Sequence, residues 1–295
     1  MFNNYNCDEF MRDNILQLLS VKDDLPPLPE ILIQLEKLVN DPKSDLEAIA
    51  ELVESDPVLS GKLIQLANSV LLGGGRDKAG DLGSAVMRLG IKMILDLAYT
   101  LKLSNMFARL PQFDQLQFWK HTFSVALLSQ ALAKKLELSK QEQEVSYVAG
   151  LMHDIGILVF FHLIPEEYIS FTKEIKNSEE TLGSLEKEKF GIDHSELGGS
   201  FILRKWPVSS KVSKSAKLHI QEMTCNGTNL PIPQIVNLAN RIASGYGAPH
   251  KMTACEIQPL EESLMQSLKM DENEIQRMME NVLESVEQAE SLLNG

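Results

Sequence analysis

The chain has 295 residues, of which 41 are acidic and 28 basic, so its formal net charge at neutral pH is −13. Apolar residues make up 44% of the sequence, which is enough to bury a sizeable core and excludes a wholly disordered chain. The length suits one large domain or two ordinary ones. The excess of negative charge repels phosphate backbones and anionic lipids, so we expect no nucleic-acid binding and no membrane association.

The cysteines and the N-terminus indicate a cytoplasmic protein. Cys7, Cys225 and Cys255 are far apart and form no CxxC pair, which excludes a disulfide framework and a zinc ribbon. The first residues, MFNNYNCDEF, have neither a basic start nor a long apolar run, so they do not resemble a secretory signal. The most apolar stretch, residues 156–165, is about half the length of a membrane span.

Helical patterns run through most of the chain. Apolar residues recur at intervals of three and four, first at residues 28–39 and then at 46–53. Three pairs have the spacing of helix capping boxes. These pairs are Ser44 with Glu47, Ser139 with Glu142, and Asp271 with Glu274. The pattern predicts an all-α fold of about a dozen helices joined by short turns, without internal repeats.

Two stretches, residues 77–83 and 224–233, have the composition of true loops. The second loop separates a main body from a C-terminal portion. We therefore expect an N-terminal helical segment at residues 1–19, a main domain at 20–220, and a helical extension at 221–295 that packs on the main body.

The last predicted helix, residues 271–294, combines an apolar seam with a strong negative charge. Residues 270–294 contain seven acidic side chains and one basic side chain. The seam follows spacings of four and three, as in a coiled coil. It consists of Ile275, Met279, Val282, Val286, Ala289 and Leu293. Two interpretations stay open: the helix docks on its own body, or it binds a signalling partner or a second copy.

The residues most suggestive of chemistry are the adjacent His153 and Asp154, inside an apolar helical segment. Burying this pair is costly unless it is hydrogen-bonded or binds a metal. Imidazole nitrogen and carboxylate oxygen together suit zinc, iron or manganese. Three further histidines lie on neighbouring predicted elements and would complete a cluster if those elements pack together. They are His121, His194 and His219.

An ordered series of motifs surrounds these residues. It comprises Leu25-Pro26-Pro27-Leu28-Pro29, Asp56-Pro57, Leu66-Ala67-Asn68-Ser69, Arg88-Leu89-Gly90, Trp119 with His121, Gly150 to Gly156 (GLMHDIG), Phe190 to Gly198 (FGIDHSELG) and Trp206-Pro207. The series resembles the HD superfamily of metal-dependent phosphohydrolases and, more closely, the HDOD domain of bacterial signalling proteins. The resemblance covers about residues 20–220. It implies an HD-superfamily-like helical bundle with the His153–Asp154 segment at its centre.

The chain departs from the catalytic members of the superfamily at several positions. The resemblance implies a final Asp ligand on a later helix, where the best match here is Asn240. Gln117 stands where the cyclic dinucleotide phosphodiesterase branch has a carboxylate, and Ile157 where that branch has Lys. A single His219, followed by Ile220, replaces a histidine pair. Each departure removes a charge or a ligand from the predicted centre.

The resemblance therefore favours a non-catalytic regulatory module of signal transduction that acts through protein contacts or a small ligand such as a nucleotide. The alternative is a metal-dependent phosphohydrolase acting on a nucleotide or cyclic dinucleotide, with Asp154 as its essential residue. Under either interpretation His121, His153, Asp154, His194 and His219 are the candidate ligands for iron, manganese or zinc; a buried polar cluster without metal is the third interpretation. We expect His162 to be a core or rim residue, His250 to be solvated, and the lysines of residues 205–217 to form a solvated helix face.

Overall fold

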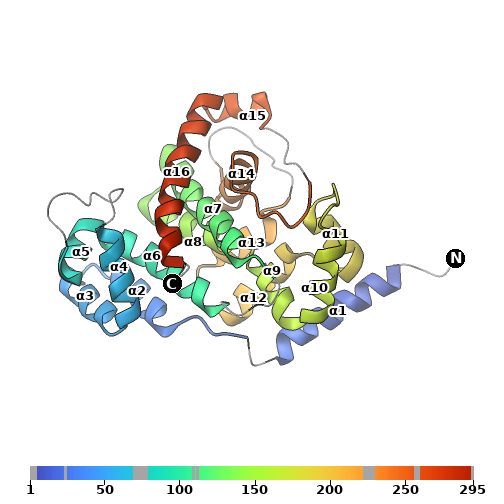
Figure 1. The fold of residues 1–295 in the computed structure, drawn as a ribbon, viewed down its shortest axis with the longest axis horizontal. Helices are drawn as coiled ribbons and strands as arrows, with labels where there is room; N and C mark the ends of the chain where they lie inside the picture. The colour runs from blue at the N-terminus through green and yellow to red at the C-terminus, as the bar shows by residue number, and fades with distance from the viewer. Residues whose placement is uncertain are drawn as a thin grey trace. The chain divides into compact units, whose positions relative to one another are not determined.

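The computed structural model describes residues 5–22, 25–68, 79–107, 110, 113–221, 230–255 and 260–293 (Figure 1). Every regular element in these ranges is a helix, which confirms the all-α prediction. Gly73–Gly75, Cys225 and most of the loop predicted at 224–233 lie outside the described residues.

The helices form two compact units, and each is described by itself. The first unit comprises residues 1–26 and 109–280, and the second comprises residues 27–108 and 281–295. The domain boundaries predicted from the sequence stay a prediction.

The second unit contains α2 to α6. Their bounds are α2 (Glu30–Asn40), α3 (Leu46–Glu54), α4 (Pro57–Ala67), α5 (Leu82–Leu89) and α6 (Ile91–Met106). Helix α3 is capped by Asp45, whose side chain accepts the Ala48 N–H, one residue after the cap expected at Ser44. Helix α6 packs against α2, α4 and α5.

Several of the sequence motifs that carry the resemblance have structural roles in this unit. The Asn68 side chain accepts the Ala79 N–H at 2.7 Å and donates to the Ala79 carbonyl at 2.9 Å. Arg88 donates to the Ala67 carbonyl and to the Asn68 side chain. Asp56 accepts the Leu59 N–H at the start of α4 and is ion-paired with Lys102. These contacts join the ends of α4, α5 and α6.

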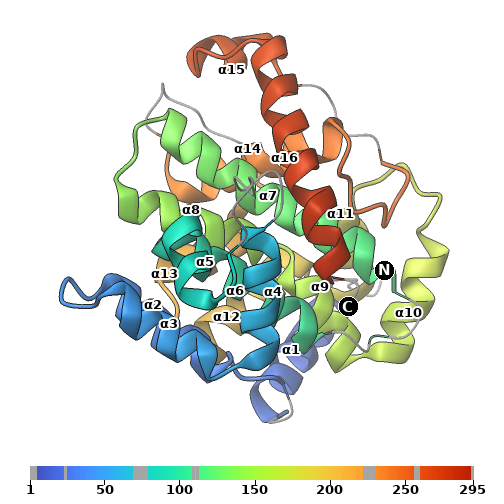
Figure 2. The same ribbon diagram turned by 60° about the vertical axis from the view of Figure 1, so that its left-hand side comes forward.

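The first unit contains the other helices. Their bounds are α1 (Tyr5–Val21), α7 (Gln115–Lys135), α8 (Lys140–Leu151), α9 (Ile155–Leu163), α10 (Pro165–Glu174), α11 (Leu182–Phe190), α12 (His194–Lys205), α13 (Ser210–Leu218), α14 (Ile232–Gly245), α15 (Glu262–Ser267) and the first part of α16 (Glu272–Leu293). Helices α7 and α14, far apart in the sequence, lie side by side, and both contact α8 (Figures 1 and 2). Helix α12 packs between α9 and α13. The capping box predicted at Ser139 and Glu142 is present in full at the start of α8.

Residues 140–163, which contain α8 and α9, form the one candidate membrane span among the described residues. This segment resembles a membrane span in length and apolar composition alone, and 83% of its most apolar stretch is buried inside the protein. Eight of the nine residues of α9 are buried. Such burial is typical of a core helix, which can be as long and as apolar as a membrane span.

Helix α16 buries the described part of its apolar seam. Ile275, Met279, Val282 and Val286 are all at most 6% exposed. The Lys135 ammonium of α7 lies 2.6 Å from the Glu274 carboxylate, and Asp271 caps the helix start by accepting the Glu274 N–H. The side chains of Ala289 and Leu293 lie outside the described set. Partner binding through residues 271–294 stays a prediction.

Candidate metal centre

The five predicted ligands come from four places in the first unit, and the structure brings them together. His121 lies in α7, His153 in the turn after α8, and Asp154 at the start of α9. His194 is the first residue of α12, and His219 directly follows α13. All five are buried, with relative exposures between 0 and 4%.

Short backbone turns aim these side chains inward. Gly191 ends α11 with a φ of 71°, in the left-handed region that favours glycine. Asp193 then caps α12 by accepting the Glu196 N–H at 2.8 Å, which fixes His194 at the first helical position.

The Asp154 carboxylate lies at the middle of the cluster. Its Oδ2 is 3.1 Å from His153 Nε2 and 3.5 Å from His121 Nε2. Its Oδ1 is 3.1 Å from His219 Nε2 and 3.5 Å from His194 Nε2. Each carboxylate oxygen thus faces two imidazoles, and Asp154 is shared between two groups of three potential ligands.

Hydrogen bonds at Nδ1, the ring nitrogen that faces away from Asp154, determine the tautomers of three of these histidines. The Nδ1 atom of His121 donates to the Ala248 carbonyl at 2.6 Å. The same atom of His153 donates to the Gly150 carbonyl, and that of His219 to the Ala216 carbonyl, both at 2.7 Å. Because a carbonyl oxygen can only accept, the proton of each neutral ring resides on Nδ1. The three Nε2 lone pairs therefore point at Asp154 and at one another.

This arrangement fits a cation. The Nε2 atoms of His121 and His153 are 3.3 Å apart, and neither neutral ring has a proton to place between them. Asp154 Oδ2 and His219 Nε2 are among the buried side-chain atoms of the described residues that have no hydrogen-bond partner. Ligands bound at about 2.1 Å to a tetrahedral metal lie about 3.4 Å apart, which matches the separations of 3.1–3.5 Å measured here.

The pKa values support the same interpretation. Burial lowers the pKa of His153 to about 4, although the Asp154 charge opposes the shift. Burial alone would raise the pKa of Asp154, but the adjacent His153 imidazole holds it well below its usual range. At neutral pH His153 is therefore neutral and Asp154 is ionised, which are the protonation states that a metal requires of these two residues.

Glu186 belongs to this site, and the sequence analysis missed it. Its Oε2 atom accepts the His194 backbone N–H at 2.7 Å and contacts His194 Nδ1 at 2.5 Å. Burial acts against protonation of His194, but the Glu186 charge raises its pKa to about 9, so His194 must release a proton when it binds a metal. The Tyr168 hydroxyl donates to Glu186 Oε1 at 2.5 Å. This fully buried carboxylate orients His194 as outer carboxylates orient metal-binding histidines.

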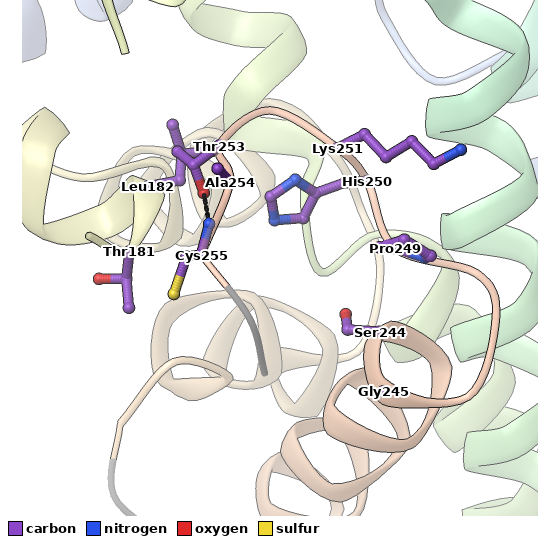
Figure 3. A pocket seen from close by; sticks show the side chains of 10 residues that line it. All are labelled: Thr181, Leu182, Ser244, Gly245, Pro249, His250, Lys251, Thr253, Ala254 and Cys255. Atoms are coloured by element: carbon purple, nitrogen blue, oxygen red, sulfur yellow. Dashed lines mark hydrogen bonds between the residues drawn. The ribbon is translucent and has the colours of Figure 1, made fainter. Parts of the chain in front are cut away.

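A pocket of about 430 Å³ lies beside the cluster and is bordered by His250 (Figure 3). The sequence predicts a solvated His250. In the structure its ring is half-buried and packs edge-on against His121, with the ring centroids 5.5 Å apart. The difference arises because the segment after α14 returns across α7, a tertiary contact without a local sequence signal.

The model of the HDOD domain matches residues 25–222 of this chain. The chain belongs to the HDOD domain family. This match covers the five clustered residues and ends before Asn240 and His250.

Solved structures share the fold of this HDOD protein. An HDOD domain protein of unknown function from Geobacter sulfurreducens is 20% identical with a TM-score of 0.73, over 97% of this chain and 98% of that one. A candidate phosphohydrolase from Shewanella amazonensis is 23% identical with a TM-score of 0.69, over 93% and 97% of the two chains. A candidate signal transduction protein from Marinobacter aquaeolei is 17% identical with a TM-score of 0.74, over 99% and 67%. These likenesses show the fold alone.

A curated relative, an uncharacterised protein of Treponema pallidum, is 24% identical over 200 residues. The match covers 67% of this chain and 38% of the relative.

The residues that depart from the catalytic pattern occupy specific places in the first unit. Asn240 is half-buried in α14, and its Oδ1 receives the Ser244 hydroxyl at 3.4 Å. The α14 residue that contacts a candidate ligand is Asn237, whose amide donates to the His219 carbonyl at 2.6 Å. Ile157 is fully buried. Gln117 donates to the Pro249 carbonyl at 2.6 Å, a bond that a carboxylate could not make.

The remaining candidates lie apart from the two potential metal-binding groups. His162 is half-buried in the last turn of α9, as expected of a rim residue. Of the lysines of residues 205–217, those in α13 are exposed, and Lys211 is 3.1 Å from Glu142. These lysines form the solvated helix face that the sequence predicts.

Proposed function

We propose that this HDOD protein is a regulatory module of signal transduction whose His–Asp centre binds a divalent metal for structure and ligand recognition rather than for hydrolysis. The observation that supports this proposal is the composition of the centre. Four imidazoles converge on Asp154, and among the described residues this is the only carboxylate in the two potential metal-binding groups. Iron, manganese and zinc all suit this donor set.

A metal held here would join four segments of the first unit. His121, His153, His194 and His219 come from α7, the α8–α9 turn, the start of α12 and the end of α13. The ion would balance the Asp154 charge and accept the nitrogen lone pairs that point inward. The burial of all five side chains restricts access to the ion, whereas a catalytic metal needs an open coordination position. Protein contacts would then transmit the state of the domain, and the exposed acidic face of α16 is one surface available for them.

The alternative, a phosphohydrolase, draws on one specific observation: Asp154 presents one oxygen to each of two potential metal-binding groups. Metal ions held by these residues would supply water activated for attack on phosphorus; this hydrolysis would consume the water, break the P–O ester bond and release an alcohol and a phosphate. Two divalent ions would bring four positive charges to a centre with one carboxylate. Asn240 adds no negative charge, so the centre favours binding over turnover.

Hydrolysis measured with the metal-loaded full chain distinguishes the regulatory module from the phosphohydrolase. Protein loaded in turn with iron, manganese or zinc is incubated with AMP, a cyclic dinucleotide and bis(p-nitrophenyl) phosphate. We expect metal in the protein but no hydrolysis above that of the matched Asp154→Asn variant. Hydrolysis that requires metal and is lost in Asp154→Asn would contradict the regulatory proposal and establish the phosphohydrolase.

A further inference from the structure

Residues of the pocket lie close to the candidate ligands at two places, His121 and His194. His250 forms part of one wall, and its ring packs against the His121 ring at 5.5 Å between centroids. Thr181 and Leu182 also line the pocket. The next residue, Gly183, is packed so closely that a Cβ atom there would lie 3.8 Å from His194 Cε1. A ligand in the pocket would therefore be close to ligand residues from both groups.

Two hydrogen bonds from α7 hold the loop that forms this pocket. His121 Nδ1 donates to the Ala248 carbonyl at 2.6 Å, and Gln117 Nε2 donates to the Pro249 carbonyl, also at 2.6 Å. The two donors are one helical turn apart, and the two acceptors are consecutive. The loop is thus attached through one of the candidate metal ligands, so the pocket and the centre are mechanically coupled.

The lining of the pocket favours an anion. The chain carries an excess of thirteen negative charges, yet among the described residues none of those lining the pocket is acidic. Lys251 also lines the pocket, but its side chain extends outward, so that its ammonium lies away from Cys255 and from the space between the labelled side chains (Figure 3). Its φ of 58° is in the left-handed region.

The polar lining atoms can donate hydrogen bonds. His250 Nδ1 accepts the Met252 N–H at 3.1 Å, so the neutral ring carries its proton on Nε2. Figure 3 shows this ring turned toward the space between the labelled side chains. Thr253 Oγ1 accepts the Cys255 N–H at 3.4 Å and retains its hydroxyl proton as a donor. Ser244 adds a second hydroxyl, whose proton is directed to Asn240 Oδ1 at 3.4 Å. A phosphate group, which offers several acceptor oxygens and a double negative charge, matches this set.

We propose that this pocket binds a small phosphorylated molecule, of the size of a mononucleotide, as the signal that the domain recognises. Its volume of about 430 Å³ is at the lower end of the roughly 300–1,000 Å³ of small-molecule sites, which favours a compact ligand. The proposal rests on the regulatory function above and adds the chemical class of the ligand.

Cys255 gives a direct measure of occupancy, because its side chain lines the pocket and is in no disulfide. In a metal-loaded full chain with Cys7→Ser and Cys225→Ser, the rate of Cys255 alkylation is measured with AMP, inorganic phosphate, adenosine or acetate. We expect AMP at saturation to slow alkylation by about fivefold or more, since a bound ligand covers most of such a pocket. Phosphate should protect at higher concentration, and adenosine and acetate should protect less.

Two charge reversals test where the ligand lies. Lys251→Glu should weaken the protection by AMP by about tenfold in concentration. Lys269→Glu is the matched control, because Lys269 is also an exposed lysine with a positive φ, of 53°, but does not line the pocket. Gln117→Glu should also weaken protection, since it removes the donor to the loop.

Absence of protection by both AMP and phosphate in protein that contains its metal would overturn the proposal. Equal protection by adenosine or acetate would overturn the phosphate class, and equal loss in Lys251→Glu and Lys269→Glu would overturn the location. The regulatory function fails independently: AMP that protects Cys255 and is also hydrolysed would leave the pocket supported and the non-catalytic role contradicted.

Discussion

At the scale of single residues, the centre depends on the groups behind its ligands. Three backbone carbonyls and Glu186 occupy the outer nitrogens of the four histidines, and they set which nitrogen faces Asp154. Such contacts fix ring orientation and raise the basicity of a ligand. Glu186 is the charged one of these four groups, so its replacement should weaken metal binding even though it contacts the cluster only through His194.

We expect Glu186→Gln to lower metal affinity by about 10–100-fold, because the amide lacks the charge that supports His194. A competition titration against a chelating dye measures the affinity. Glu188→Gln, an exposed change on the same helix, is the control and should leave the affinity unchanged. Equal affinity of the Glu186→Gln variant and the wild type would show that His194 does not bind the metal.

The ion pair of Asp56 with Lys102 predicts a pH dependence. Burial acts to raise the pKa of Asp56, but the hydrogen bonds from Lys102 and the Leu59 N–H lower it below its usual value of 3.8. A lowered folded-state pKa contributes stability above pH 3.8, and this contribution is lost as the pH falls through the folded-state value.

Asp56→Asn should therefore cost about 0.5 kcal/mol of unfolding free energy at pH 7, because the amide still caps α4 but no longer pairs with Lys102. Below the folded-state pKa of Asp56 the difference should vanish. Urea unfolding across this pH range measures it, with the exposed Glu54→Gln as control. A difference that persists at the acid end would contradict the ionic origin.

At the scale of helices, close backbone contacts bring the ligands together. An ideal Cβ atom on Gly156 in α9 would lie 1.9 Å from the His194 carbonyl oxygen and 2.8 Å from Gly198 N. On Gly150 in α8 it would lie 2.8 Å from the Ala126 Cα of α7. Helices α9 and α12 therefore touch through backbone at the point where both present ligands.

Gly156→Ala should destabilise the protein by about 1–3 kcal/mol and displace His194, because the new methyl group meets backbone that cannot yield cheaply. Unfolding free energy and metal content are measured together. Gly61→Ala in α4 is the control: its Cβ meets nothing within 4 Å, so the change should stabilise by about 0.5–1 kcal/mol. Wild-type stability in Gly156→Ala would contradict the packing described here.

The sequence predicted what local patterns determine. The capping box at Ser139 is present, and the five candidate ligands lie together, which the sequence predicted only on the condition that their helices pack against one another. Glu186 was missed because it lies eight residues before His194 on a charged helix that resembles a solvated face. His250 was missed because its position depends on the return of the chain across α7, which no local pattern encodes.

At the scale of the molecule, the negative charge is unevenly distributed. The net charge of −13 excludes a general anion-binding surface, yet the described lining of the pocket beside the centre has no acidic side chain. Metal bound only by the folded state would also stabilise the first unit, by an amount that grows with the logarithm of the free metal concentration. Loss of the metal should therefore lower the thermal midpoint as well as empty the centre.

The central claim is that the His–Asp cluster binds a divalent metal, and elemental analysis of the purified full chain tests it most directly. We expect about one or more equivalents of iron, manganese or zinc per chain, and less than about a tenth of this in Asp154→Asn with its helical circular dichroism retained. Wild-type protein that contains no metal, and whose thermal midpoint does not rise when iron, manganese or zinc is added, would contradict the account.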